Sequence, residues 1–161
     1  MQKMRFFFTL LSIILPFVCL GQTKAESAFI SFVEHKIIIP DDIKYNCQWS
    51  YAIVVAETDN QNNIVKIQFM NDVSSNLKTN FNVLKGYHFP VSYKVGRQAV
   101  IFYFSVDNRE ICKAQNADFT YVFPNDVLLK IAGDLGEARK KFPNAIFIAE
   151  PVLKILYETQ H

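Results

Sequence analysis

Two apolar runs on either side of a turn cluster constrain the fold of this chain more than any other part of its sequence. Residues 48–57 form an apolar run, with Tyr51, Ile53 and Val55 on one face of an extended chain and Ala52, Val54 and Ala56 on the other. Over residues 64–70, apolar and polar side chains alternate. A period of two is typical of β-strands, whose successive side chains point to opposite faces. Residues 59–63 have the sequence Asp-Asn-Gln-Asn-Asn, and Asp and Asn tolerate the left-handed backbone of tight turns. The pattern therefore predicts a β-hairpin.

The segments around this hairpin predict helices and a third strand. Asp72 can cap a helix over residues 73–85, where apolar side chains recur every three or four positions, and Gly86 can end it. A shorter helical pattern covers residues 27–37. Residues 98–106 alternate like a strand but are apolar on both sides over most of their length. Both faces of that strand must therefore be covered by other elements.

The C-terminal extension, residues 115–161, predicts a strand, a helix and further extended chain. In order, these are a strand at 119–123, a helix at 125–142, and extended segments at 145–149 and 152–157. Pro151 separates the last two segments, which suits a sheet edge or a bend. We expect the helix to cover the second face of the apolar strands. The predicted fold class is α+β: an antiparallel sheet with a β-β-α-β unit and this strand-helix-strand extension.

The first 21 residues have the three-part layout of an export signal. Lys3 and Arg5 form a basic head, residues 6–20 are an apolar run, and the small residue Gly21 precedes the polar Gln22. The run is shorter than the ~20 residues that span a bilayer as a helix. We therefore predict cleavage between Gly21 and Gln22 and a periplasmic or secreted protein. An uncut leader that anchors the chain is the alternative.

Residues 22–161 have the composition of a single ordered domain. They retain 15 of the 17 basic residues and all 15 acidic ones, so their formal charge balances. A neutral chain lacks the positive footprint of a nucleic-acid-binding protein. The whole sequence contains 15 Phe and 7 Tyr but only 5 Gly, which indicates a packed aromatic interior. We expect no nucleic-acid partner and no membrane span in the mature chain.

Two cysteines, Cys47 and Cys112, follow the predicted signal. An even number of cysteines in an exported chain is compatible with a disulfide. The simpler alternative is two buried thiols that never meet. The count and spacing of the cysteines leave both possibilities open.

No arrangement of residues in the sequence predicts a reaction centre. A Cys–His hydrolase needs a nucleophile beside an oriented histidine, yet His35 lies in a helix-like stretch, His88 in a loop and His161 at the last position. Asp41 and Asp42 follow a proline and are interpreted as a turn. The sequence contains no zinc-ligand spacing and no phosphate loop. We expect no catalytic residue, metal or cofactor.

The order strand, turn, strand, helix, loop, strand over residues 37–106 resembles the C-terminal domain of TonB, the energy-coupling protein of Gram-negative envelopes. The matching segments are Ile38-Ile39-Pro40, the polar turn at 59–63, the helix start at 72–77, and Gly96 before the last apolar strand. The chain departs from the family at residues 47–49, where Cys-Gln-Trp replaces a usual glycine, and in its hairpin turn, which lacks glycine.

The resemblance implies a free-standing exported module, since no long Pro-rich reach separates the leader from the domain. It implies binding of a partner peptide by addition to a strand edge. It also implies that the first and last strands of the unit pair antiparallel, which places Cys47 near Cys112 and favours a disulfide.

Our leading hypothesis from the sequence is a non-catalytic binding or interaction protein of the cell envelope. A small exported hydrolase, whose site residues gather only in the fold, is the alternative. A structural envelope component held by an uncut leader is a third possibility.

Overall fold

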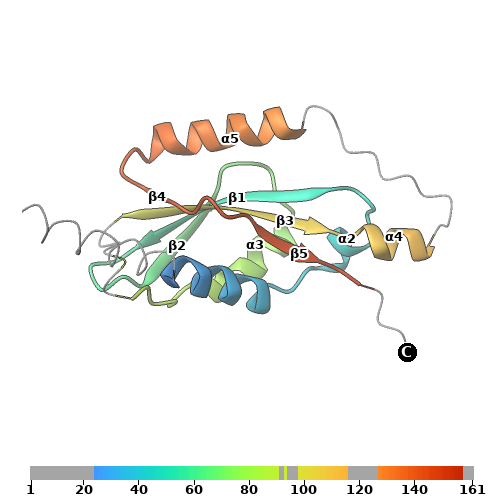
Figure 1. The fold of residues 1–161 in the computed structure, drawn as a ribbon, viewed down its shortest axis with the longest axis horizontal. Coiled ribbons are helices and arrows are strands. Elements are labelled where there is room, and N and C mark those ends of the chain that lie inside the picture. The colour runs from blue at the N-terminus through green and yellow to red at the C-terminus, as the bar shows by residue number, and fades with distance from the viewer. Residues whose placement is uncertain (1–23, 91–92, 94–97, 116–126, 158–161) are drawn as a thin grey trace, which may run out of the picture.

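A computed structural model of the chain describes residues 24–90, 93, 98–115 and 127–157 (Figure 1). In these residues helices pack with a five-stranded mixed sheet, so the predicted α+β class is confirmed. The predicted export signal, with its cleavage site at Gly21 and Gln22, and the predicted strand at 119–123 lie outside the described residues.

The predicted β-β-α-β unit is present. β1 (Ser50–Thr58) pairs antiparallel with β2 (Ile64–Phe69) on one side and with β3 (Ala99–Asp107) on the other. Between β2 and β3 the chain forms α3 (Ser75–Asn80), which continues directly into the 3-10 helix η1 (Phe81–Leu84). The hairpin prediction is therefore confirmed.

The start of the α3 helix differs from the prediction. Ser74, and not Asp72, is its N-cap: the Ser74 hydroxyl accepts a hydrogen bond from the backbone N–H of Leu77 at 3.2 Å. Asp72 lies too early in the chain to reach the first unsatisfied N–H groups of a helix that begins at Ser75. After η1 the chain turns at Gly86, whose φ of +85° is a conformation that glycine adopts without strain.

The C-terminal part contains α5 (Val127–Lys141), β4 (Ile146–Phe147) and β5 (Val152–Ile155). Both short strands pair with β3, and both run parallel to it. The prediction of a wholly antiparallel sheet was wrong here. The chain leaves the end of β3 and returns to its start before β4 begins, and a strand that starts from the same end must run in the same direction. Pro151 separates the two strands at the sheet edge, as predicted.

Three further helices border the sheet. Residues 24–36 form an N-terminal helix, in agreement with the helical pattern predicted at 27–37. α2 (Asp41–Lys44) is a single helical turn where the sequence predicted only a turn, and α4 (Arg109–Gln115) was not predicted. Among the described helices, none is both long and apolar enough to cross a bilayer.

Helices cover the sheet on both faces (Figure 1). The N-terminal helix, α3 and η1 pack on the first face, where the fully buried rings of Phe29, Phe81 and Phe102 meet. α5 packs on the second face, where Ile131 and the fully buried Ala138 join a separate apolar cluster with the inward side chains of β1 and β3. The prediction that this helix covers the second face is confirmed.

Candidate functional site

The order of the strands determines which sheet edges can meet a partner. The order is β2-β1-β3-β4, and β5 also pairs with β3. The outer edge of β3, the last strand of the β-β-α-β unit, is therefore occupied by the chain's own C-terminal strands. Among the described residues the sheet ends at β2 on one side and at β4 and β5 on the other (Figure 1).

The β2 edge is closed at its start and carries features that discourage further pairing. At its start, the backbone N–H of Ile64 donates to Tyr87 O at 2.9 Å, and Ile64 O accepts from the N–H of Gly86 at 2.8 Å. The register of β2 then shifts by one residue, and the exposed Lys66 forms an ion pair with Glu57 at 3.0 Å. Bulges and edge lysines are the devices by which natural sheets discourage further pairing.

The β5 edge is apolar on its exposed side, and the one lysine of β5, Lys154, is bound to the N-terminal helix. Leu156 N–H donates to Asp107 O at 2.8 Å, so the backbone groups of alternate residues face β3, and those of Leu153 and Ile155 point away from the sheet. The side chains of Leu153 and Ile155 are each 43% exposed, and Tyr157 on the same side of the chain is 67% exposed. We call the outer side of residues 153–157 the open edge.

The opposite face of β5 anchors the strand to the rest of the protein. Val152 is fully buried in the main core, and Leu156 packs against that core. The Lys154 ammonium donates to the backbone carbonyl of Glu34 in the N-terminal helix. β5 is therefore held on one face, while the apolar side chains of Leu153 and Ile155 are exposed on the other.

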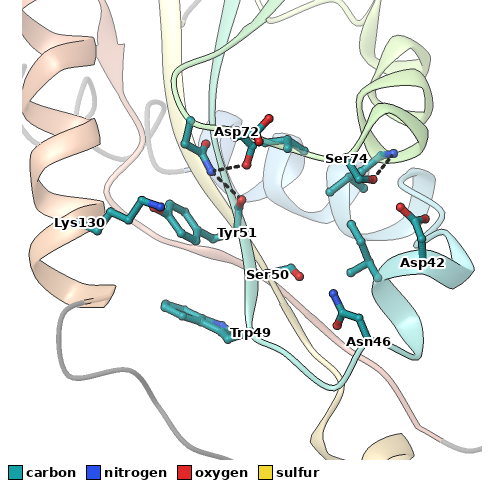
Figure 2. Close-up of a pocket in the computed structure, with 12 residues that line it drawn as sticks. Asp42, Asn46, Trp49, Ser50, Tyr51, Asp72, Ser74 and Lys130 are labelled. Atoms are coloured by element: carbon teal, nitrogen blue, oxygen red, sulfur yellow. Dashed lines mark hydrogen bonds between the residues drawn. The ribbon is translucent and has the colours of Figure 1, made fainter.

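A second feature is a cavity of about 240 Å³ at the start of β1 (Figure 2). β2 pairs with β1 only from Val54 onward, so the first part of β1 extends beyond it. The side chain of Asn71 replaces the missing strand: its Oδ1 accepts from the N–H of Ile53 at 2.8 Å, and its Nδ2 donates to Tyr51 O at 3.0 Å. The cavity opens beside this side-chain pairing.

Aromatic rings form one wall of the cavity. Trp49 and Tyr51 lie 5.8 Å apart between ring centroids on the second face of the sheet, next to Tyr103. The Tyr51 hydroxyl donates to a carboxylate oxygen of Asp134 in α5 at 2.8 Å. Partial burial, together with this carboxylate, raises the pKa of Tyr51 well above its ordinary value. The Tyr51–Asp134 hydrogen bond therefore fixes α5 beside the cavity.

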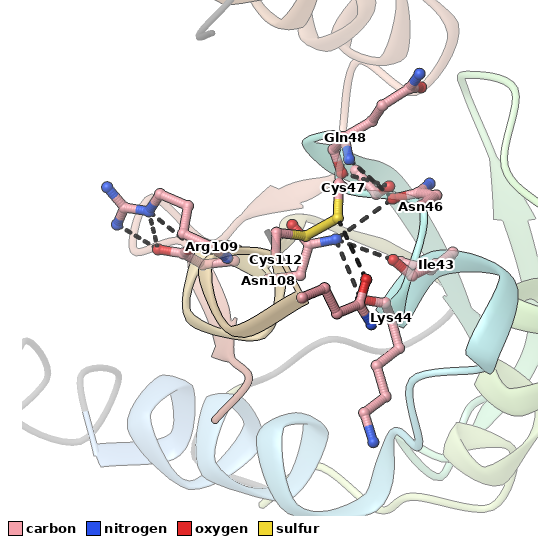
Figure 3. The surroundings of a disulfide bond; sticks show 11 residues. Ile43, Lys44, Asn46, Cys47, Gln48, Asn108, Arg109 and Cys112 are labelled. Atoms are coloured by element: carbon pink, nitrogen blue, oxygen red, sulfur yellow. Dashed lines mark hydrogen bonds and ion pairs between the residues drawn. A yellow bond between two sulfur atoms is a disulfide. The ribbon is translucent and has the colours of Figure 1, made fainter. Parts of the chain in front are cut away.

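The disulfide between Cys47 and Cys112 supports the opposite wall (Figure 3). The two Cα atoms are 5.5 Å apart, and the bond joins the segment before β1 to the buried face of α4. The fully buried Asn108 reinforces this link, because its Nδ2 donates to the carbonyl of Ile43 at 3.0 Å. These contacts fix α2 and the following residues, which border the cavity.

Beside the disulfide, Arg109 forms an ion pair with Asp107. The hydrogen bond from the guanidinium holds the pKa of the Asp107 carboxyl below its usual range. Both residues lie at the junction of β3 and α4.

The histidines considered for a hydrolase lie apart from both features. His35 Nδ1 is 2.7 Å from the carbonyl oxygen of Ser31, and His88 Nδ1 is 3.2 Å from Asn63 Oδ1. His88 also lies within electrostatic reach of the Asp59 carboxylate in the hairpin turn. No group of metal-ligating side chains occurs within the described ranges. His161 lies outside the described residues.

Comparisons with protein-family models, curated proteins and solved structures find no match to this chain. The sequence predicted the extended segment that forms the open edge, but it could not predict which edge of the sheet is free. It also missed the cavity, whose walls come from α2, the start of β1, the segment before α3, and α5. No local spacing connects these four segments.

Proposed function

We propose that this protein is an exported, non-catalytic interaction module, periplasmic or secreted, that resembles the TonB C-terminal domain and binds an extended segment of a partner protein. The observation that supports this best is the open edge at β5. An added strand there would hydrogen-bond to the outward backbone groups of Leu153 and Ile155. Strand addition obtains affinity from such backbone bonds and specificity from alternate side chains.

The open edge also selects the chemistry of its partner. Leu153, Ile155 and Tyr157 offer an apolar stripe at alternate positions on one face. A partner segment with apolar side chains at every second residue would bury this stripe, at roughly 25 cal/mol for each Å² removed from water. The outer side of β3 is not free for strand addition, because β4 and β5 already pair with it.

Two variants test this proposal in envelope extract. Ile155→Pro removes a backbone N–H that points away from β3 and leaves the ladder bonds of its neighbours in place. Leu129→Ser is the control, because Leu129 is an equally apolar residue, 77% exposed, on α5. A photo-crosslinking side chain at position 153 identifies proteins that contact the edge itself.

We expect one or a few proteins to crosslink at position 153, and we expect Ile155→Pro to abolish their capture while Leu129→Ser leaves it unchanged. Equal loss in both variants would indicate general surface stickiness and would count against strand addition. Absence of any crosslinked partner in envelope extract would overturn the proposal.

A further inference from the structure

The open edge at β5 fits a second copy of itself. The proposed function requires an extended partner segment with apolar side chains at every second residue, and residues 153–157 are such a segment. The side chains of Leu153, Ile155 and Tyr157 are all exposed on the same side of the chain. One β5 strand therefore offers to another the same apolar surface that it needs to cover.

The backbone of β5 suits antiparallel pairing about a two-fold axis. Leu156 N–H donates to Asp107 O, so the backbone groups of Leu153, Ile155 and Tyr157 point away from β3. An axis through Ile155 places it opposite Ile155 of the second copy and places each Leu153 opposite a Tyr157. All three outward residues then meet outward residues. An axis one residue earlier would instead place Tyr157 opposite Pro151, which has no N–H to donate.

The charges of β5 do not oppose this pairing. Lys154 is the one charged residue of the strand, and its ammonium donates to the backbone carbonyl of Glu34 on the first face of the sheet. It therefore lies on the opposite face from the exposed apolar side chains. Residues 22–161 contain 15 basic and 15 acidic residues, so two copies do not repel each other through their net charge.

The opposite margin of the sheet limits such an assembly to two copies. The register of β2 shifts at its start, and Lys66 forms an ion pair with Glu57 at 3.0 Å. Two β5 strands that pair with each other use both open edges, and the joined sheet then ends at a protected β2 strand on each side. The contact is the same patch on both copies, so it closes as a dimer and does not extend into a filament.

We propose that the open edge pairs with the same edge of a second copy, in a two-fold symmetric dimer whose sheet continues through antiparallel β5 strands. This inference rests on the proposed strand addition at the open edge and names its partner. Two short strands cover less surface than the roughly 1,600 Å² of a typical stable interface. We therefore expect a dissociation constant on the order of 10 μM.

Charge reversal at the two-fold axis tests the pairing directly. The full-length chain is expressed with its own leader, purified after export, and studied by sedimentation equilibrium. Ile155→Lys and Ile155→Glu each place two like charges opposite each other, and each should weaken dimerisation at least tenfold. An equimolar mixture of the two variants brings opposite charges together at the axis and should restore the dimer. A variant that failed to fold would not recover on mixing.

Leu129→Lys and Leu129→Glu are the matched controls. They introduce the same charges at an apolar residue that is 77% exposed on α5, away from β5. Both should dimerise like the wild-type protein, alone and when mixed. Weakening by these controls equal to that of the Ile155 variants would indicate a general effect of charge and would overturn the inference.

A wild-type protein that stays monomeric up to about 1 mM would also overturn the inference. If position 153 then still crosslinks a different protein in envelope extract, strand addition stands without self-pairing; if it crosslinks nothing, both proposals fail. A dimer that persists in both Ile155 variants, or that does not recover when they are mixed, would show that Ile155 does not face its own copy. Either result would overturn this inference and leave the proposed function untouched.

Discussion

Replacing both Cys47 and Cys112 with alanine removes a cross-link whose cysteines are 65 positions apart in the sequence. In the chain-entropy model, a bond that closes a loop of this length limits the unfolded state and contributes about 4 kcal/mol to the free energy of unfolding. Asn108 still links α4 to α2 in the variant. We therefore expect the native fold to persist with lower stability.

Urea denaturation followed by Trp49 fluorescence measures this loss. With a slope of about 2 kcal/mol per molar urea, a loss of about 4 kcal/mol lowers the midpoint by about 2 M. The wild-type protein in a strong reductant is the control, because it retains both sulfur atoms and should show nearly the same midpoint as the double variant. A loss below 1 kcal/mol in both samples would refute the reasoning, since the cross-link would then not restrict the unfolded chain.

Three other changes probe the same region. Asn108→Ala should lower the free energy of unfolding by roughly 1–3 kcal/mol in urea titrations, because it leaves a buried carbonyl of α2 without its donor. Tyr51→Phe should cost about 1 kcal/mol by the same assay and accelerate amide exchange in α5, because the hydrogen bond to Asp134 is lost; unchanged exchange would contradict a role in holding α5. The pKa of Asp107 is lower in the folded state, so its stabilisation is present above the unfolded pKa of about 3.9 and is lost as pH falls through the folded value. Asp107→Asn should flatten that acid limb of stability against pH, and an identical limb would contradict the Asp107–Arg109 pairing.

The hairpin and the long helix could be predicted because their signals are local. Alternation over β1 and β2 and the recurring apolar positions of α5 reflect the geometry of each element by itself. The apolar character of β1 on both faces even predicted that a second helical layer would cover it. The capping residue of α3 was wrong because Asp72 and Ser74 are both good caps, and only the folded backbone selects between them.

The direction of the last strands and the candidate sites could not be predicted in the same way. β4 and β5 are too short to indicate their partner strand, and their parallel pairing with β3 depends on where α5 returns the chain. The open edge exists because β5 lies at one margin of the sheet. At the other margin, the register shift in β2, the edge residue Lys66 and the residues 86–88 discourage further pairing.

The amino-acid sequence by itself determined the hairpin, the long C-terminal helix, their apolar faces and the α+β class, because these follow from the side chains of neighbouring residues. Only the tertiary structure decided which strand edge stays free, and only it brought Asp42, Trp49, Asp72 and Lys130 around one cavity. Those residues come from segments far apart in the chain, and their proximity results from the packing of both sheet faces and not from any local spacing.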